Sequence, residues 1–378
     1  MKSKYWIVLT LAIILIVSVV IVVQAQGKEN GKVRVIAHTD KEISDAEAKD
    51  CKVVRNAKTL KALVCSKDAA SELGLEEDIQ VFAVDSGANT QINADTVQSS
   101  GNTGIGRKVA ILDTGYNYNH TELILSYLGG KDFVNGDNDP FDDNGHGSHV
   151  AGIITADGAT AKAKGVAPDA GVIAGKVLDA SGSGFFSDVV AAIYWAVDGP
   201  DGKPNTADDF KADAISMSLG TRPPYTYQGF CDDVLPDLTN AIKYAVKRNV
   251  AVVAAAGNSG GGGVSIPGCI SYSTTVGAVD SSDVIASFSG RGKAVDISAP
   301  GVSIYSSWLG SSYATASGTS MATPMVAGTV ALIKYAHPTY SVSQVQNALF
   351  KTAKDLGRRG KDTSYGYGRV DASGAVNY

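Results

Sequence analysis

The stretch Lys108-Val-Ala-Ile-Leu112, followed directly by Asp113-Thr-Gly115, decides the fold class of this 378-residue chain. It is a continuous apolar run of strand length that ends in a carboxylate. Such runs are typical of parallel strands that are buried on both faces, whereas a strand with one wet face alternates apolar and polar side chains. We therefore expect a central strand of a covered parallel sheet here.

Further apolar strands alternate with helices along the rest of the chain. Strands are predicted at residues 172–177, 214–218 and 250–256, and helices after His146 and at residues 187–197, 238–248 and 325–335. This alternation predicts an α/β fold of three layers, with a mostly parallel sheet and helices on both of its faces. We assign it to residues 83–378.

Residues 32–82 form a separate, small α+β unit in this prediction. Its expected elements are strands at 32–38, 59–66 and 79–84 and helices at 45–49 and 67–73. The stretch 85–106 is rich in Gly, Asn, Ser and Thr, which is typical of a linker. We expect this linker to become a new N-terminus after a cleavage between the two units.

The first 25 residues differ from everything after them. Lys2 and Lys4 precede an apolar run over residues 5–23, and Val23-Gln24-Ala25 supplies small residues at a plausible cleavage point. This layout predicts a secretory signal peptide over residues 1–25. A run of about 20 apolar residues could instead remain as a membrane anchor. In both cases the rest of the chain is expected outside the cell.

Composition narrows the function classes. The hydrophobic fraction is 44%, the net charge is −5, and the chain lacks a Lys/Arg-rich tract, so nucleic-acid binding is not expected. The four cysteines lack Cys-x-x-Cys spacing and fit disulfides in an exported protein. Pairing them within the two regions gives Cys51–Cys65 and Cys231–Cys269; free buried thiols are the alternative. We expect a monomer without an organic cofactor.

Four sequence blocks place reactive side chains at the ends of predicted strands or the starts of helices, where the sites of open α/β sheets gather. They contain Asp113 (Asp-Thr-Gly), His146 (Asn-Gly-His-Gly-Ser-His), Asn258 (Ala-Gly-Asn-Ser-Gly) and Ser320 (Ser-Gly-Thr-Ser-Met-Ala-Thr-Pro). Taken singly, these residues are ordinary turn and cap residues. Their joint presence in this order is specific.

The four blocks resemble the motifs of the subtilisin-like serine proteases, the subtilase family, over residues 91–376. The resemblance implies a catalytic triad of Asp113, His146 and Ser320, with Asn258 and the Ser320 N–H as oxyanion donors. A serine hydroxyl needs a base to take its proton as it attacks, and histidine has an unperturbed pKa near neutrality. His149 is expected to be structural.

The resemblance also implies two edges that bind an extended peptide by added β-pairing. These edges are Gly182-Ser183-Gly184, for which a plain flexible turn is the alternative, and Ser218-Leu219-Gly220. An apolar subsite four residues before the cut bond would comprise Phe186, Val189 and Leu219, and the pocket next to that bond would comprise Ala255, Ala256, Gly257 and Ser265. Because no carboxylate falls in either set, we expect broad endopeptidase action with an apolar or aromatic preference, not cleavage after paired basic residues.

Calcium is a further expectation, because the family often carries calcium sites. Residues 157–164 depart from one common calcium loop, although Glu122 could still be a ligand. Two acidic loops are better candidates, since spaced carboxylates on a Gly-rich loop suit a hard cation. Their proposed ligands are Asp132, Asp137, Asp139 and Asp142 in the first loop and Asp198, Asp201 and Asp208 in the second.

The unit 32–82 resembles a prodomain that assists folding and inhibits its own protease. We expect self-cleavage near Phe82–Ala83, with Phe82 in the pocket beside the bond and Ile79 in the apolar subsite. Two other functions remain open at this point. One is a catalytically inactive surface protein that keeps the fold, and the other is a processing protease with narrow specificity.

Overall fold

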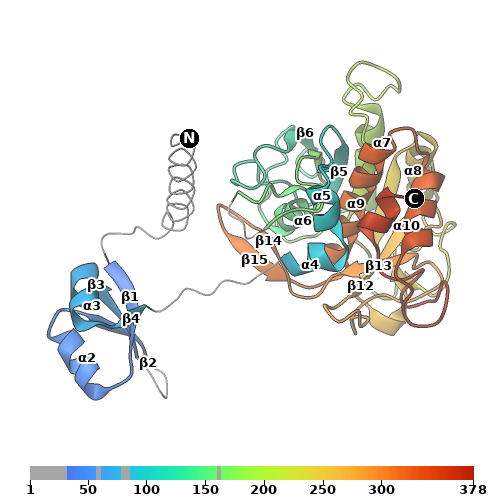
Figure 1. The fold of residues 1–378 in the computed structure, drawn as a ribbon. Coiled ribbons are helices and arrows are strands. Elements are labelled where there is room, and N and C mark those ends of the chain that lie inside the picture. The colour runs from blue at the N-terminus through green and yellow to red at the C-terminus, as the bar shows by residue number, and fades with distance from the viewer. Residues whose placement is uncertain (1–31, 57–60, 78–85, 160–162) are drawn as a thin grey trace, which may run out of the picture. The chain divides into compact units, whose positions relative to one another are not determined.

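A computed structural model describes residues 32–56, 61–77, 86–159 and 163–378 of the chain. The chain divides into two compact units, Met1–Phe82 and Ala83–Tyr378 (Figure 1). The predicted signal peptide, the strand at 79–84 and the proposed cleavage point lie outside the described residues. Among the residues that are described, no helix has both the length and the apolar character needed to cross a membrane.

The small unit is an antiparallel sheet with two helices. Its elements are β1 (Lys32–Ala37), α2 (Asp40–Glu47), β2 (Lys52–Asn56), β3 (Lys61–Ser66), α3 (Lys67–Leu73) and β4 (Glu76–Glu77), and the strand order is β2-β3-β1-β4. The predicted helix at 45–49 is wrong in its bounds. α2 begins earlier because Thr39 Oγ1 accepts from the Glu42 N–H while the Glu42 carboxylate accepts from the Thr39 N–H, a reciprocal cap that starts a helix.

The large unit contains a parallel sheet of seven strands, in the order β13-β12-β10-β8-β5-β7-β6. These strands are β5 (Lys108–Asp113), β6 (Tyr127–Asp132), β7 (Gly171–Lys176), β8 (Ala214–Met217), β10 (Ala251–Ala255), β12 (Thr274–Val279) and β13 (Ile297–Pro300). Short strands β9 (Thr226–Tyr227), β11 (Val264–Ser265), β14 (Ile304–Ser307) and β15 (Tyr313–Ala316) pair separately.

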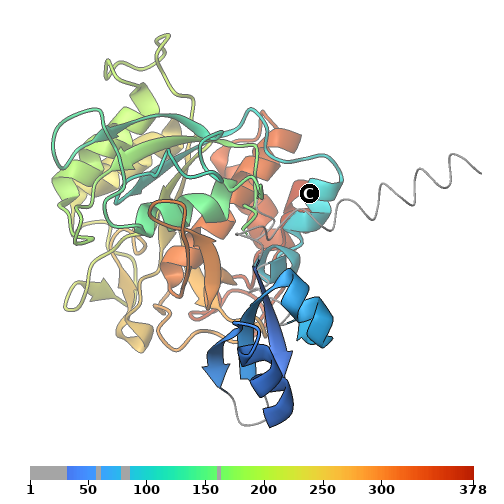
Figure 2. The same ribbon diagram turned by 90° about the vertical axis from the view of Figure 1, so that its left-hand side faces the viewer.

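Helices cover both faces of this sheet (Figures 1 and 2). They are α4 (Ser86–Gln91), α5 (Ala94–Ser99), α6 (His146–Thr155), α7 (Phe186–Asp198), α8 (Pro236–Lys247), α9 (Thr319–Ala336), α10 (Val342–Thr352) and α11 (Ala372–Val376), with a 3₁₀ turn at Gly260–Gly262. α6 and α9 belong to one buried apolar cluster, and α7 and α8 belong to another. The predicted three-layer α/β architecture is confirmed.

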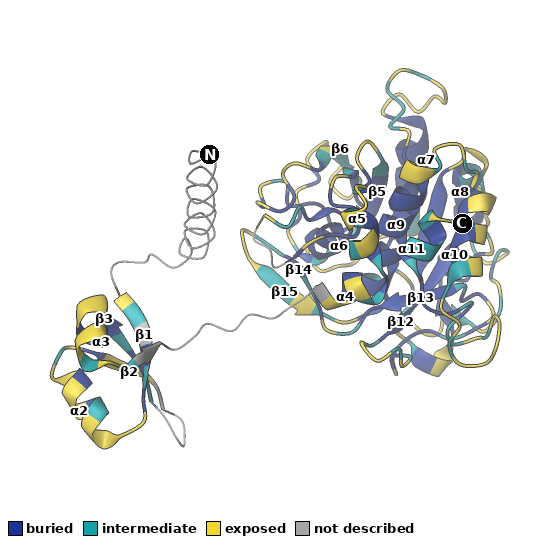
Figure 3. Cartoon of the chain, viewed as in Figure 1, coloured by how far each residue is buried: buried dark blue, intermediate teal, exposed yellow. Residues whose placement is uncertain are grey.

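Strand β5 shows why its sequence is apolar throughout. Val109 and Ile111 belong to the cluster under α6 and α9, whereas Ala110 and Leu112 belong to the cluster under α7 and α8. Successive side chains of a strand point to opposite faces, so a strand between two helical layers needs an apolar residue at every position. Figure 3 shows these central elements as buried and the exposed residues on the outer loops and helix surfaces.

The predicted linker at 85–106 is wrong for most of its length. It contains α4 and α5, and Ile92, Ala94 and Val97 are buried in the main core. The Asn102 side chain donates to the Leu332 carbonyl at 2.9 Å and so fixes the end of this segment against α9. These short helices contain so few apolar residues that their sequence resembles a loop. Those few apolar residues nevertheless pack into the main core.

Both predicted disulfides are present. Cys51 and Cys65 join the end of the α2 region to β3, and Cys231 and Cys269 join two loops of the large unit. The Cys231 N–H also donates to the Cys269 carbonyl at 3.0 Å, so the second bridge reinforces a backbone contact between these loops. Each bridge lies within one unit, and a cut between the units would therefore leave both intact.

The segment 86–102 gives a stability prediction. In a Ser320→Ala background, Ile92→Ala should lower the free energy of unfolding by about 2–5 kcal/mol, because it opens a cavity under a wholly buried side chain. Thr96→Ala, at an exposed position of α5, is the matched control and should change it little. Chemical denaturation of both variants measures the difference. Equal free energies of unfolding for the two variants would show that this segment does not contribute to the core and acts as a linker.

Candidate active site

A cavity of about 1090 Å³ opens at the carboxyl ends of β8 and β10 and beside the start of α6. β5 lies between β7 and β8 in the sheet. The strands β7 and β6 lie on one side of β5, and β8, β10, β12 and β13 lie on the other, so the strand order reverses at β5. Crevices at such switch points are the usual ligand sites of parallel α/β sheets. Of the predicted residues, the cavity lining includes His146, Ser320, Asn258, Gly182, Ser183, Gly184, Phe186, Val189, Ser218, Leu219, Gly220, Ala255, Gly257 and Ser265.

Asp113 and His146 form a direct pair. The Asp113 carboxylate ends β5 at 1% exposure, and its Oδ1 lies 2.7 Å from His146 Nδ1. Burial acts to lower the pKa of His146, but the charge and hydrogen bond of Asp113, helped by the charge of Asp142, outweigh it and raise this pKa above its ordinary value. The carboxylate therefore fixes the ring and stabilises its protonated form.

Helix α6 brings His146 close to β5 through a glycine contact. A Cβ on Gly147 would lie 2.1 Å from the Gly115 carbonyl oxygen, a distance that no side chain tolerates. The Gly147 N–H instead donates to Thr114 Oγ1 at 2.8 Å. The His-Gly pair in the sequence is thus a requirement of the backbone approach that seats the imidazole.

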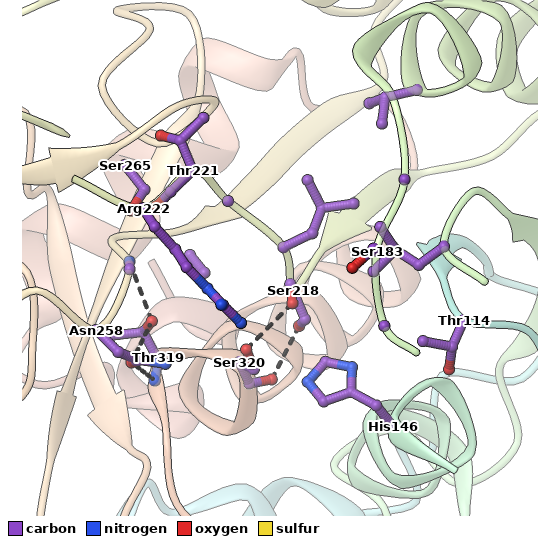
Figure 4. A pocket seen from close by; sticks show the side chains of 18 of the residues that line it. Thr114, His146, Ser183, Ser218, Thr221, Arg222, Asn258, Ser265, Thr319 and Ser320 are labelled. Atoms are coloured by element: carbon purple, nitrogen blue, oxygen red, sulfur yellow. Dashed lines mark hydrogen bonds between the residues drawn. The ribbon is translucent and has the colours of Figure 1, made fainter. Parts of the chain in front are cut away.

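Ser320 lies in the first turn of α9, which begins at Thr319 and so earlier than the helix predicted from 325. In this conformation its hydroxyl donates to the Ser218 carbonyl at 3.1 Å, and its side chain lies beside the His146 ring (Figure 4). Catalytic hydrogen bonds are often made only when substrate is bound.

Pro324 explains how Ser320 is anchored. A helical residue normally offers its carbonyl to the N–H four positions later, but proline at position 324 has no N–H. The Ser320 carbonyl accepts from Ser218 Oγ at 2.8 Å instead. Ser218 therefore contacts both the backbone and the side chain of Ser320, and it ties the start of α9 to the end of β8.

Thr319 orients the amide of Asn258. Asn258 Oδ1 accepts from the Thr319 N–H at 3.0 Å and from Thr319 Oγ1 at 3.1 Å (Figure 4). Because the oxygen is held in this way, the NH₂ group of the amide is the end left to donate into the cavity. Thr319 has no role in the sequence-based prediction, although it stands within the serine block.

Asp142, predicted as a calcium ligand, instead connects the pieces of the site. It is fully buried; Oδ1 accepts from Thr114 Oγ1 at 2.9 Å and Gly145 N–H at 2.9 Å, and Oδ2 accepts from Ser148 N–H at 2.8 Å. Burial acts to raise the pKa of Asp142, but hydrogen bonds from the N–H groups of Gly145, Ser148 and Asn144 and from the Ser148 hydroxyl lower it below its ordinary value. With both oxygens committed to the loops on either side of the Asp113–His146 pair, Asp142 does not fit a metal site.

Lys176 supplies a buried positive charge behind the site. Its Nζ donates to the Thr114 carbonyl at 2.6 Å, to Asp143 Oδ1 at 2.7 Å and to the Leu178 carbonyl at 3.0 Å. The lysine thus joins the residue after Asp113 to the histidine loop and to the start of the 178–184 segment. Lys176 has no role in the sequence-based prediction, because a lysine inside the predicted strand 172–177 gives no sign of partners that are distant in the chain.

His149 takes no part in the cavity. Its Nε2 lies 3.1 Å from the Ile304 carbonyl and 3.0 Å from the Ala314 carbonyl, and burial, the main cause, lowers its pKa to about 4. A neutral ring that donates to these carbonyls joins α6 to β14 and β15. This arrangement agrees with the structural role expected of it.

One residue of the predicted binding set is misplaced. Ala255 lines the cavity, but Ala256 is fully buried in the core with α7 and α8. Neighbouring residues at the end of a strand face opposite sides, so only one of the two can reach substrate. Gly257 lies so close to Ser265 that a Cβ at position 257 would lie 2.0 Å from Ser265 Oγ, and this part of the cavity wall therefore needs a glycine.

The other predicted calcium ligands do not assemble. Asp132 accepts from the N–H groups of Val134 and Asn135, and Asp198 accepts from the Tyr244 hydroxyl. Asp201 and Asp208 surround the hydroxyl of Thr206 at 3.4 and 2.6 Å. The described part of the chain contains no group of three or more His, Cys, Asp or Glu side chains that could hold a metal ion. No catalytic step is assigned to calcium.

Two more proposed ligands, Asp137 and Asp139, cap turns in the same loop. Asp137 Oδ1 accepts from the Asp139 N–H at 2.9 Å, and Asp139 Oδ1 accepts from the Tyr118 hydroxyl at 2.7 Å. Glu122 accepts from the Gly158 N–H at 2.8 Å and from the Tyr313 hydroxyl at 2.8 Å. Calcium thus stays a prediction from the sequence.

Residues 104–368 match the model of the subtilase family. The chain belongs to this family. It is therefore a serine endopeptidase of the subtilisin type. Subtilases generally bind calcium, but the ligand set proposed from this sequence does not identify a site.

Individual relatives agree with the family match. The chain is 41% identical over 287 residues to Subtilisin Savinase of Lederbergia lenta, which covers 76% of this chain and 97% of the relative. It is 40% identical over 305 residues to the alkaline protease of Alkalihalobacillus alcalophilus, at 80% and 73% coverage. Subtilisin J of Geobacillus stearothermophilus is 35% identical over 404 residues, at 99% coverage of both chains.

The raised pKa of His146 predicts the pH dependence of this subtilase. In the predicted triad only the neutral His146 ring can take a proton from Ser320, so kcat/KM is expected to fall as the pH drops through an apparent pKa above the ordinary value of about 6.5. Asp142→Asn removes one charge that raises this pKa and should move the acidic limb to lower pH. Asp233→Asn, at an exposed position, is the control and should leave the limb in place. A limb that stays or rises in Asp142→Asn contradicts the assignment.

The orientation of Asn258 predicts an effect on turnover. Asn258→Ala should lower kcat by about 10²–10³-fold, the range known for loss of the corresponding amide in subtilisin itself. KM should change little, because the missing donor acts on the charge that develops during the reaction. Asn240→Ala, exposed on α8, is the control. A change confined to KM would show that Asn258 binds ground-state substrate instead.

Proposed function

We propose that this protein is a secreted subtilase, made as a precursor, that cleaves peptide bonds through an acyl-enzyme on Ser320. The observation that carries the proposal is the Asp113–His146 pair in one cleft with Ser320, opposite an amide held by Thr319. These groups come from β5, α6, α9 and the loop after β10, which are far apart in sequence. Their convergence is what covalent catalysis by a serine requires.

The residues suggest the following sequence of steps. On substrate binding the Ser320 hydroxyl turns toward His146, which accepts its proton as Oγ attacks the peptide carbonyl. Asp113 stabilises the resulting imidazolium through Nδ1–H. The negative oxygen accepts from the Asn258 amide and from the Ser320 N–H, which stands in the first helical turn, where backbone donors lack partners within the helix. His146 then returns the proton to the leaving amine.

Substrate would bind in extended form between two backbone edges. Among the described residues, neither Gly184 nor Gly220 uses its backbone N–H or C=O in a hydrogen bond. Free backbone groups on both sides of a cleft can pair with a peptide strand whatever its side chains are. We infer broad specificity, with an apolar or aromatic preference at the subsite of Phe186, Val189 and Leu219, which line the same cavity.

Maturation completes the proposal. We infer that residues 1–25 direct export, that residues 32–82 act as an inhibitory prodomain, and that the enzyme cuts itself near Phe82–Ala83. The two disulfides support an oxidising, extracellular location. The mature enzyme is proposed to act as a monomer on protein and peptide substrates, without nucleic acid as a partner.

Self-processing gives a direct test of this function. Purified Ser320→Ala should remain one polypeptide that still contains residues 32–82, whereas the wild type and the control Ser311→Ala, at an exposed loop position, should begin near residue 83. Mass spectrometry of the intact chains measures the difference and also reports whether residues 1–25 are retained as an anchor. Trimming of Ser320→Ala at the same point when it is purified alone would rule out self-cleavage.

An organophosphonate probe separates an active protease from an inactive protein with the same fold. The mature wild type should be labelled at Ser320 and the Ser320→Ala variant should not. An unlabelled wild type that also fails to cut peptides would refute the proposal. Turnover of a peptide library then distinguishes broad from narrow specificity.

A further inference from the structure

Arg222 is a cationic residue of the substrate cavity that none of the preceding assignments uses. It lines the cavity together with Thr221 and Pro223, directly after the edge 218–220. Apart from His146, it is the one basic side chain among the residues that line this cavity, and none of those residues is an Asp or Glu. The cleft thus carries a positive charge without a lining carboxylate to balance it.

The backbone at the base of this side chain is held firmly. The Thr221 N–H donates to the Ile266 carbonyl at 3.1 Å, Ser265 Oγ donates to the Thr221 carbonyl at 2.7 Å, and the Ile266 N–H donates to Thr221 Oγ1 at 3.0 Å. The Arg222 carbonyl accepts from the Tyr225 N–H at 3.0 Å, which closes a turn. Arg222 therefore projects from a fixed point beside Ser265.

Ser265 and Gly257 form the wall of the pocket that the sequence assigns to the residue next to the cut bond. From its position beside Ser265, the Arg222 side chain extends across the cavity toward the part of the wall that carries Ser320 and Asn258 (Figure 4). The residue is exposed. Within the described ranges, its guanidinium makes no ion pair and no hydrogen bond.

We propose that Arg222 is a specificity-determining residue that favours a carboxylate side chain on the substrate residue whose carbonyl Ser320 attacks. This inference rests on the proposed function and narrows it. An unpaired guanidinium offers a planar fork of donors that matches a carboxylate, while its aliphatic stem can pack against apolar side chains. The pocket would accept apolar residues and glutamate, and it would discriminate against lysine and arginine.

The size of the effect follows from exposure. An ion pair between solvent-exposed groups is weak and screened by salt, so we expect a preference of about two- to fivefold and not an absolute requirement. The apolar subsite of Phe186, Val189 and Leu219 is a separate part of the cleft and keeps its own preference. Low ionic strength should enlarge the preference for glutamate, and high salt should reduce it.

The test uses the mature enzyme and a set of quenched fluorescent peptides that differ only at the residue before the cut bond. This residue is Glu, Gln, Lys or Phe, and the cut position is verified by mass spectrometry. In the wild type at low salt, kcat/KM for Glu should exceed that for Gln by about two- to fivefold, and Lys should be the poorest. The Glu/Gln ratio should fall to about one in Arg222→Gln, persist in Arg222→Lys, and invert in Arg222→Glu.

Arg359→Gln is the matched control, since Arg359 is an exposed arginine that does not line the cavity; it should keep the wild-type ratio. A Glu/Gln ratio that is the same in the wild type and Arg222→Gln would overturn the inference, as would a charge preference that appears only at another peptide position. In both cases, cleavage of the Phe peptide would leave the proposed protease function standing. Failure to cut any peptide, without labelling by the serine probe, would refute that function itself.

Discussion

The short contact between the Asp113 carboxylate and the His146 ring is the interaction on which the site depends. It needs a charged side chain at the buried end of a strand, where Asp113 Oδ1 accepts from the Thr114 N–H and lies against His146, while Oδ2 has no hydrogen-bond partner among the described residues. β5 is covered on both faces by apolar clusters, so water cannot screen the carboxylate from the side. The helix that carries His146 can come close enough only because Gly147 lacks a side chain.

A layer of polar groups behind this pair holds its geometry. Asp142 connects the loop after β5 to the start of α6, and Lys176 connects the same loop to the segment that begins at Leu178. Neither group faces the cavity, and both are buried with their hydrogen-bonding capacity used. Buried polar groups that are fully paired make a structure rigid, whereas a half-paired set would be costly. The positions of Asp113 and His146 are thus fixed by residues that do not line the cavity.

The layered fold and most residues of the candidate site could be predicted from the sequence, because both depend on patterns that are local in the chain. The apolar runs of β5, β7, β8 and β10 identified the centre of the sheet, and the four blocks identified His146, Asn258 and Ser320 of the cavity lining and the buried Asp113 behind them. The predictions were wrong or incomplete where contacts between distant parts of the chain decide whether a segment is ordered or what a side chain binds. α4 and α5 carry too few apolar residues to be recognised, edge strand β6 contains two glycines, and Asp142 looks like a metal ligand until its partners are known. Thr319, Lys176 and Arg222 have no sequence signal of their own, since their roles depend on neighbours distant in the chain.

Pro324 has a consequence for the order in which this enzyme can acquire its chemistry. Since its own helix cannot satisfy the Ser320 carbonyl, the first turn of α9 relies on Ser218, which follows β8. α9 formed in isolation would therefore lack the contact that holds the Ser320 carbonyl, and this contact can form only when the end of β8 lies beside the helix. The position of the Ser320 backbone is thus shared between a helix and a strand end that are about a hundred residues apart in the chain, and neither element holds it by itself.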